Sequence, residues 1–388
     1  MATAFIFSAA AGIFLAMSLS TLIHLRWVRG LPTLDVLGPG AEFKSGAGKP
    51  VKCSVVIAAR DEQMRIEQTI HHLLAQLGVE LEIIVVDDRS TDRTGEILSN
   101  LAKADPRVQI KRVDVLPEGW LGKCHACRIG ADAATGKWIL FTDADCWLKP
   151  DVIIRAIRLA EREGVDHVTL TPGIAAQTPG ARAWHLAFLI TIANWMSGVN
   201  RDRPRAYLGL GAFNLVRATA YRECGGYTAL RLTVLDDLKL GLLLRRAGKR
   251  TRGFIGDDDL ECHWSPTVPG MIRIMEKNYF AALDFSAGLA LAAGLAGVLL
   301  LCSAVLGPLT GTKAGLAAAL TPLSFILPAG VLAARLGWSW RAAALTPLMF
   351  PVLLYAMLNS VIVTYRRGGI RWRDTFYPLE VLRKGCLR

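Results

Sequence analysis

The chain has 388 residues, of which 52% are hydrophobic, and its 45 Lys and Arg outnumber its 33 Asp and Glu to give a net charge of +12. A mean hydropathy of +0.34 is too high for a protein that is soluble along its whole length. Much of the positive charge lies beside apolar runs, as in "YRRGGIRWR", and no nucleic-acid recognition motif accompanies it. We therefore expect a lipid bilayer as partner and no nucleic acid.

Residues 2–25 form an apolar run without any Lys, Arg, Asp or Glu, and they are long enough to span a bilayer. The run lacks a basic n-region and is longer than the core of a usual signal peptide, which favours a retained anchor over residues 1–28. Arg26 and Arg29 follow the run directly, so the positive-inside rule places this end in the cytoplasm.

After residue 50, short apolar runs rich in β-branched residues alternate with segments of helical spacing. The predicted strands cover 52–60, 81–88, 108–115 and 137–143, and the predicted helices cover 62–76, a segment with Ser90 or Thr91 as N-cap, and 123–134. Alternation of this kind implies right-handed crossovers and a mainly parallel sheet. The sequence therefore predicts an α/β domain with a Rossmann-like sheet.

Acidic pairs follow two of the predicted strands: Asp87 and Asp88 end the second, and Asp143 and Asp145 end the fourth. Because ligands of open α/β sheets bind at the carboxyl ends of the strands, we expect both pairs at one crevice. Asp143 and Asp145 are two residues apart in extended chain, so their carboxylates point the same way. Oxygen ligands suit Mg²⁺ or Mn²⁺, and through such an ion the site can hold a diphosphate.

The cysteines give no metal or redox signal. Cys124 and Cys127 form the one close pair, "CHAC", and a structural zinc site would need a second pair at ligand spacing. We expect both thiols to be reduced.

Five stretches in order resemble the inverting GT-A enzymes of glycosyltransferase family 2. They are "SVVIAARDE" (54–62), "EIIVVDDRSTDRT" (82–94), "GWLGKCHACRIGADAATGKWILFTDAD" (119–145), "GLGAFNLVRATAYRECGGY" (209–227) and "LDDLKLGLLLRRAGKR" (235–250). The resemblance covers roughly residues 50–280. The apolar runs and "GGIRWRDTFYPL" (368–379) look like the membrane-bound branch of ceramide, hopanoid-associated and carotenoid glycosyltransferases.

The resemblance implies a GT-A nucleotide-diphospho-sugar transferase fold and a set of functional residues. The donor nucleotide would contact Ala59, Arg60, Glu62, Asp87, Asp88, Lys123 and Asp143. Asp145, with Asp143, would bind the metal. Asp237 matches the usual catalytic base, and Asp236 stands where the family usually has Glu. A base is needed because the acceptor hydroxyl loses its proton as it attacks.

The leaving diphosphate also needs neutralisation. Many family members place a Gln/Arg-x-x-Arg-Trp motif after the base, and this chain has no such motif, which disfavours a polymer-making synthase. His263, Trp264, Arg273 and Lys277 occupy that region and are the candidates for the diphosphate. Asp257, Asp258 and Asp259 are expected to form a solvated acidic loop.

Three apolar runs near the C-terminus, roughly 285–309, 314–334 and 341–364, predict further membrane helices. One anchor and three further spans would put the basic C-terminal residues outside, against the positive-inside rule. One run is therefore expected to be re-entrant or interfacial, and Pro322, Pro328, Pro347 and Pro351 make broken helices plausible.

The predicted organisation has five parts: an anchor (1–28), a cytoplasmic GT-A domain (50–265), an interfacial amphipathic segment (266–283), C-terminal transmembrane helices (284–366) and a basic juxtamembrane tail (367–388). This describes a multi-pass protein of the inner (plasma) membrane. Residues 182–199 read equally well as an interfacial or as a buried helix.

The expected activity is metal-dependent transfer of a hexose from a nucleotide-sugar, with UDP favoured, to a membrane lipid hydroxyl. One alternative is a polyprenyl-phosphate acceptor, which is already anionic and needs no base. A nucleotidyltransferase and a transporter are further alternatives, although the apolar runs carry almost no charges of the kind that line a transport path.

Overall fold

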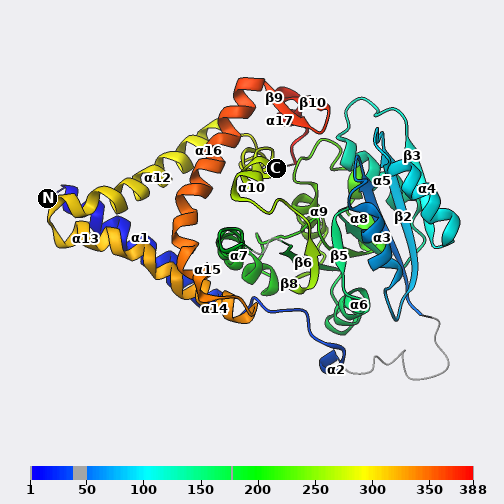
Figure 1. Ribbon diagram of the computed structural model, residues 1–388, viewed down its shortest axis with the longest axis horizontal. Coiled ribbons are helices and arrows are strands. Elements are labelled where there is room, and N and C mark those ends of the chain that lie inside the picture. The colour runs from blue at the N-terminus through cyan, green and yellow to red at the C-terminus, as the bar shows by residue number, and fades with distance from the viewer. Residues whose placement is uncertain (1, 38–49, 176–177, 388) are drawn as a thin grey trace.

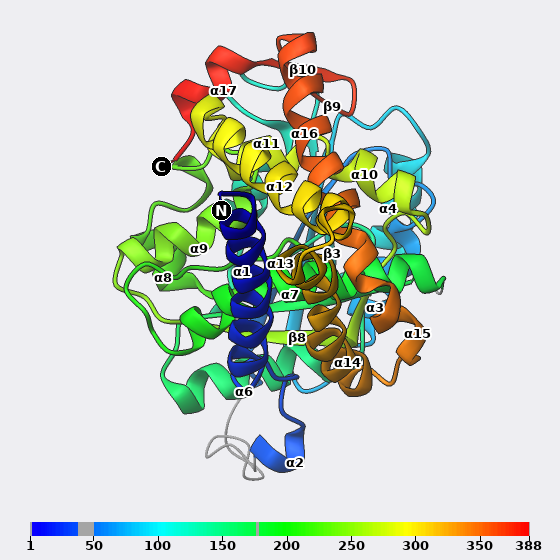
Figure 2. The same ribbon diagram turned by 90° about the vertical axis from the view of Figure 1, so that its left-hand side faces the viewer.

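The computed structural model describes residues 2–37, 50–175 and 178–387. Figure 1 shows an α/β domain on one side and a group of long helices that project from it on the other. The N-terminal end of α1 lies at the far tip of these helices, and Figure 2 looks along them onto the α/β domain.

Ten strands lie within the described residues. They are β1 (Lys52–Ala59), β2 (Glu80–Asp88), β3 (Val108–Val113), β4 (Trp138–Thr142), β5 (Cys146–Leu148), β6 (His167–Ile174), β7 (Asn214–Arg217), β8 (Thr251–Cys262), β9 (Gly369–Trp372) and β10 (Thr375–Pro378). Eight form one sheet in the order β3-β2-β1-β4-β7-β6-β8-β5. Pairing is parallel from β3 through β2 and β1 to β4, and between β6 and β8. The predicted α/β class with a mainly parallel sheet is confirmed.

Helices cover both faces of this sheet and extend from it. They are α1 (Ala2–Leu25), α2 (Leu34–Leu37), α3 (Ile66–Leu74), α4 (Thr94–Ala104), α5 (Gly122–Ala133), α6 (Val152–Glu163), α7 (Pro179–Asn200), α8 (Ala218–Glu223), α9 (Asp236–Arg246), α10 (Val268–Met275), α11 (Asn278–Ala282), α12 (Ala287–Leu306), α13 (Lys313–Leu320), α14 (Ile326–Arg335), α15 (Trp340–Leu345), α16 (Met349–Arg367) and α17 (Leu379–Gly385). The short 3₁₀ turns are η1 (Gly226–Thr228), η2 (Gly307–Thr310), η3 (Thr321–Phe325) and η4 (Thr346–Leu348).

Strand β1 lies in the middle of the core because both of its faces are apolar. Ile57 packs with Ile66 of α3 in one buried cluster, whereas Val56 packs with Cys124 of α5 in another. Side chains alternate between the two faces of a strand, so a continuous apolar run is what a sheet covered on both sides requires.

The start of α4 differs from the prediction. The helix begins at Thr94, and neither Ser90 nor Thr91 caps it. Asp92 Oδ1 accepts a hydrogen bond from the Thr94 N–H at 2.9 Å, so an aspartate two residues before the helix satisfies this donor.

The predicted acidic loop at Asp257–Asp259 is a second error, because all three residues lie in β8. Asp259 accepts a hydrogen bond from Arg155 Nη1 at 2.6 Å, and Asp257 Oδ2 lies 3.0 Å from His185 Nε2. The side chains of Asp257 and Asp259 are nearly buried. Partners on α6 and α7 make burial of these carboxylates tolerable.

Residues 182–199 were predicted as either an interfacial or a buried helix, and they lie in α7, which is largely buried. Trp184 is 1% exposed and packs with Met271 of α10 and Ala356 of α16, whereas Trp195 is 44% exposed. The helix thus lies between the sheet and the apolar helices (Figure 1).

Four helical segments within the described residues are long and apolar enough to cross a membrane: Thr3–Leu25, Ala287–Thr310, Lys313–Arg335 and Trp340–Arg367. The predicted one N-terminal and three C-terminal candidates are confirmed. The last two segments are broken where expected, because Pro322 lies in η3 and Pro347 in η4. Pro328 and Pro351 lie in the first turns of α14 and α16, where proline is tolerated.

The fourth segment differs from the other three in where its ends lie. At its start, Ala342 and Ala343 of α15 are buried in one cluster with Ile255 of β8. At its other end, Ser360 Oγ accepts from the Phe280 N–H at 3.0 Å. Both ends of α15–η4–α16 therefore contact the α/β domain.

Residues 367–388, expected as a basic tail, hold β9, β10 and α17 over their described part. The two strands form an antiparallel hairpin in which Trp372 pairs with Thr375. Tyr377 and Leu382 are buried in the same cluster as α5. This segment is a folded part of the α/β domain.

Candidate active site

The carboxyl ends of β1, β2 and β4 lie at one edge of the sheet. Ala59 of β1 pairs with Asp87 of β2, and Ile57 pairs with Thr142 of β4, all in parallel register. Asp88 ends β2 at this edge, and Asp143 follows β4 directly. The two acidic pairs therefore lie at one edge of the sheet, as parallel pairing predicted.

A cavity of about 760 Å³ opens at this edge, within the range of small-molecule sites. Eleven of the predicted site residues line it: Ala59, Arg60, Glu62, Asp88, Lys123, Asp143, Asp145, His263, Trp264, Arg273 and Lys277. These residues come from segments as far apart in sequence as β1 and α10, so the fold brings the predicted donor and diphosphate groups together.

Among the described acids that line the cavity, Asp145 is the one without an ion pair, whereas Glu62, Asp88, Asp143 and Glu276 each have a cationic partner. Lys123 Nζ donates to Asp143 Oδ1 at 2.6 Å. Burial, with Asp143 and Glu62 nearby, raises the pKa of Asp145 to about 7. Convergent carboxylates of this kind, all with oxygen ligands, fit a Mg²⁺ or Mn²⁺ ion.

Among the described residues, Asp87, Asp236 and Asp237 are the predicted site residues that do not line the cavity. Asp87 is buried, and its Oδ1 accepts from the Ser90 N–H at 3.2 Å. This hydrogen bond stabilises the turn that follows β2.

Asp236 and Asp237 begin α9, and their side chains point in different directions. Asp236 is buried and accepts a hydrogen bond from Tyr227 Oη at 3.0 Å. Burial raises the pKa of Asp236 to about 6, with Lys123 opposing the rise and Asp237 adding to it. Asp237 is half-buried, and its Oδ2 accepts from the Gly211 N–H at 2.7 Å.

Gly211 separates Asp237 from the acidic wall of the cavity. A Cβ at this position would lie 2.8 Å from Asp143 Oδ2, 3.3 Å from Asp237 Oδ2 and 3.3 Å from Lys123 Nζ. Asp143, Lys123 and Asp237 therefore meet around a glycine that leaves the space between them open. Burial alone would lower the pKa of Lys123, but Asp143, Asp236 and Asp237 raise it well above its usual value.

The region after β8 contributes a mixed wall. His263 packs against Trp147 with ring centroids 3.5 Å apart and ring planes tilted by 46°, and its backbone N–H donates to the backbone oxygen of Asp145 at 3.1 Å. Lys277 Nζ lies 3.9 Å from the centroid of the Trp372 ring. Burial, together with Lys123, lowers the pKa of Lys277 to about 8.

The sequence analysis missed the residues that the C-terminal hairpin brings to the cavity. Gly369, Ile370, Arg371, Trp372, Arg373 and Tyr377 all line it. Arg373 forms an ion pair with Glu62, and Tyr377 Oη accepts from the Gly122 N–H at 3.1 Å. The alternation of basic and apolar residues over 370–373 was the available signal, but it predicts a strand and not where the strand docks.

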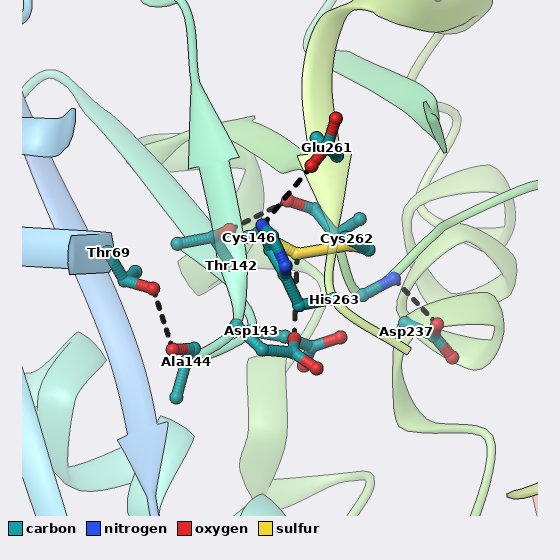
Figure 3. The surroundings of a disulfide bond; sticks show 12 residues. Thr69, Thr142, Asp143, Ala144, Cys146, Asp237, Glu261, Cys262 and His263 are labelled. Atoms are coloured by element: carbon teal, nitrogen blue, oxygen red, sulfur yellow. Dashed lines mark hydrogen bonds and ion pairs between the residues drawn. A yellow bond between two sulfur atoms is a disulfide. The ribbon is translucent and has the colours of Figure 1, made fainter. Parts of the chain in front are cut away.

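A disulfide lies directly behind the metal-site loop (Figure 3). Cys146 of β5 is bonded to Cys262 of β8, and His263 and Asp143 lie beside the bond. No local pattern indicated this pair, because the two cysteines are 116 positions apart in the sequence. Cys124 and Cys127 are free and buried, as expected.

The sheet order and the cavity at its carboxyl edge define a GT-A-like nucleotide-sugar transferase fold. Residues 54–226 match the family model for glycosyl transferase family 2. This part of the chain is a glycosyl transferase family 2 domain, and the predicted family is confirmed.

Similar proteins agree with this assignment. A β-monoglucosyldiacylglycerol synthase of Nostoc sp. (strain PCC 7120 / SAG 25.82 / UTEX 2576) is 26% identical over 255 residues, which cover 64% of this chain and 51% of that protein. A 4,4'-diaponeurosporenoate glycosyltransferase of Staphylococcus aureus (strain USA300) is 32% identical over 192 residues, or 48% of this chain and 50% of that protein. The chain thus spans about half the length of these curated relatives.

A solved structure shares the fold. The mannosyltransferase PcManGT from Pyrobaculum calidifontis, in complex with GDP-Man and Mn²⁺, superposes with a TM-score of 0.54 at 17% identity. The superposition covers 92% of this chain and 99% of that one. At this identity the likeness shows the architecture alone.

Proposed function

We propose that the protein is a membrane-bound, metal-dependent inverting glycosyltransferase that moves a hexose from a UDP-sugar to a lipid hydroxyl. The observation that carries this proposal is the cavity itself. Its acids gather where β1, β2 and β4 end, and cations from α10 and the C-terminal hairpin line the same space. A diphosphate bound through a divalent ion needs both.

The donor side follows from which groups face the cavity. Asp143 and Asp145 would hold the ion, which supplies positive charge to the departing diphosphate when bound. Asp88 and Arg60 lie at the nucleoside end, next to Glu62. We assign Asp87 to support of the turn and not to the donor, because it is turned away from the cavity.

Unpaired cations mark the diphosphate position. Within the described residues, Arg273 and Lys277 line the cavity without a carboxylate partner, whereas Lys123 is bonded to Asp143. His263 Nε2 lies 3.3 Å from Glu261 and its ring packs against Trp147, with Trp264 following it at the cavity wall. We therefore assign the diphosphate to Arg273 and Lys277, and the support of the Asp145 loop to His263.

Asp237 is the proposed base. Its carboxylate lies at the N-terminus of α9, where two backbone N–H groups hold it, from Gly211 and Leu238. Hydrogen bonds of this kind fix the position of the carboxylate next to Asp143, across the space that Gly211 leaves open. From there it can accept the proton of a hydroxyl as the oxygen attacks the anomeric carbon opposite the leaving diphosphate. Asp236, bonded to Tyr227, holds the start of α9.

A lipid acceptor fits the wall opposite the sheet. Val363, Thr364 and Arg367 of α16 line the cavity, and α16 packs along α10 and α11 at the base of the apolar helices. A hydroxyl held at the membrane surface can therefore approach the donor from this side. Two curated relatives are named as a β-monoglucosyldiacylglycerol synthase and a 4,4'-diaponeurosporenoate glycosyltransferase, and both names support a lipid acceptor.

The membrane orientation follows from where the helix ends lie. We propose that α1, α12 and α13–α14 cross the bilayer and that α15–α16 does not, because both its ends contact the α/β domain. The basic residues at the domain-facing ends are Arg26, Arg29, Arg335, Arg341, Arg366 and Arg367. The opposite turn between α12 and α13 has only Lys313, so the α/β domain faces the cytoplasm of the inner membrane.

A nucleotide-release assay tests this function. Detergent-purified protein with Mn²⁺ or Mg²⁺ would be given a panel of nucleotide-sugars and a total lipid extract, beside Asp145→Asn. We expect lipid-dependent release of UDP, lost on chelation of the metal and reduced at least about a hundredfold in Asp145→Asn. Release of inorganic diphosphate from a nucleoside triphosphate, with no UDP from any sugar, would overturn the proposal in favour of a nucleotidyltransferase.

A further inference from the structure

The C-terminal hairpin, residues 369–378, contacts the segments after β1 and β2 and the start of α5, which line the donor side of the cavity. Arg60, after β1, donates to Thr375 Oγ1 at 3.0 Å and lies 3.5 Å from Asp374. Arg373 pairs with Glu62. The hairpin is therefore fixed to the donor wall over its length, although more than 300 residues separate it from β1 in the sequence.

Two side chains of the hairpin face the cavity without serving that attachment. Arg371 is exposed and lines the cavity, and its side chain forms no ion pair or hydrogen bond with another described residue. Trp372 presents its ring to Lys277 Nζ at 3.9 Å. A guanidinium with no protein carboxylate partner, in a cavity with acids on its other wall, is suited to a bound anion.

The ring of Trp372 accounts for the position of Lys277. An ammonium held over an indole face is attracted by the ring and is restrained from turning to the nearby carboxylates. Lys277 is the N-cap residue of α11 and no side-chain carboxylate among the described residues pairs with it. Trp372 thus keeps this cation available to a ligand.

We propose that the C-terminal hairpin forms the roof of the donor site, where Arg371 binds a nucleoside diphosphate directly and Trp372 acts as a positioning residue that holds Lys277 toward it. This inference rests on the proposed function, and it adds residues from a segment whose sequence reads as a basic tail. It makes the C-terminal segment part of the donor site as well as of the fold.

Calorimetric titration of the full-length protein in detergent with UDP, and separately with GDP, in the presence of Mn²⁺ tests this proposal. We expect Arg371→Ala and Trp372→Leu each to weaken binding by about tenfold or more, and Trp372→Phe to restore most of it. Phe376→Ala is the matched control, because Phe376 lies on the same hairpin, is 45% exposed and is not a lining residue. Melting temperatures confirm that the variants are folded.

A double-mutant cycle separates positioning from a general structural role. If Trp372 acts through Lys277, Trp372→Leu should weaken UDP binding in the wild-type background and add less than about twofold in a Lys277→Ala background. Equal losses in both backgrounds, or UDP binding by Arg371→Ala and Trp372→Leu within twofold of wild type, would overturn the role of the hairpin. Absence of nucleotide binding by the wild-type protein would instead overturn the proposed function itself.

Discussion

At the scale of single residues, a glycine and a lysine determine how the charged groups of the site meet. Gly211 is the point where Asp143, Lys123 and Asp237 come together, and Lys277 is a cavity cation held by a ring. The sequence named Lys277 as a candidate for the diphosphate, whereas no charged or metal-binding motif pointed to Gly211. Both give predictions because the distances around them are short.

Gly211→Ala should reduce activity strongly without unfolding the protein. The added methyl group would lie 2.8 Å from Asp143 Oδ2, closer than carbon and oxygen atoms pack, so Asp143 or Asp237 must shift. A displacement of this size can lower kcat/KM by about a hundredfold. The nucleotide-release assay measures this. Gly330→Ala in α14, where nothing lies within 4 Å of the new Cβ, is the control and should retain activity. Unchanged kcat/KM in Gly211→Ala would contradict the assigned geometry.

Lys277 gives a pH dependence of donor binding. Its pKa is lowered to about 8 by burial and by Lys123, against the opposing charges of Asp236, Asp237 and Asp143. The ammonium is charged below this pH and loses its charge as the pH rises through it, so the KM for the nucleotide-sugar should increase above about pH 8. Lys277→Arg, which stays charged, should show a flat KM between pH 7 and 9. A wild-type KM that does not change over this interval would count against a role for Lys277 at the diphosphate.

At the scale of elements, the first half of the sheet was predictable and the second half was not. β1, β2 and β4 are continuous apolar runs, because strands buried on both faces need no polar alternation. β7 has only four residues, β6 contains Pro172 and Gly173, and β8 carries three aspartates. Asp259 and Asp257 of β8 pair with Arg155 and His185, which are distant in sequence. Local sequence patterns therefore could not show that these two acids are buried.

The same contrast applies to the candidate site. The acids after β2 and β4 could be placed from sequence, since strand ends of a parallel sheet share one edge. The hairpin residues could not, because their position depends on contacts with Arg60, Glu62 and Gly122 at long range. The role of Asp87 was also out of reach, since only the turn geometry shows which of two adjacent acids faces the cavity.

Strand β6 gives a prediction about stability. His167 is fully buried between Thr251 Oγ1 at 3.1 Å and Asn214 Oδ1 at 2.9 Å, and burial lowers its pKa to about 4. In the unfolded chain a histidine has a pKa near 6.5. Between these values the unfolded state holds a proton that the folded state lacks, so stability is present above about pH 6.5 and is lost as the pH falls toward 4.

The size of this loss is on the order of 3 kcal/mol across the window. Chemical unfolding of the detergent-solubilised protein between pH 7 and 4.5 measures it. His167→Gln, which keeps a hydrogen-bonding side chain that does not titrate, should flatten the slope. An identical slope in wild type and variant would show that other groups cause the pH dependence.

At the scale of the whole molecule, the topology that we propose would remove the conflict between four membrane crossings and the positive-inside rule. Four membrane crossings would separate the C-terminal hairpin from the α/β domain, yet the hairpin is bonded to Arg60 and Gly122 of that domain. Three crossings, with α15–α16 against the domain, place the arginines of all helix ends on one side.

Thiol labelling of intact cells tests this topology. Leu309 lies in η2, at the turn far from the α/β domain, and is 82% exposed, whereas Trp340 lies at the start of α15 and is 73% exposed. The two test variants are Leu309→Cys and Trp340→Cys. A membrane-impermeant maleimide should label the first variant in intact cells and the second only after permeabilisation, each against the unsubstituted protein. Labelling of Trp340→Cys in intact cells would contradict the proposed orientation.

The most direct test of the account is lipid-dependent UDP release by Asp237→Asn beside wild type, with the lipid product followed by mass spectrometry. Asparagine keeps the size of the side chain and an acceptor for the Gly211 N–H but is not a base. We predict a glycosylated lipid from wild type and a loss of at least about a thousandfold in turnover for the variant, with UDP binding retained. Turnover close to wild type in Asp237→Asn would contradict the hydroxyl-acceptor mechanism and would point to an acceptor that is already anionic, such as a polyprenyl phosphate.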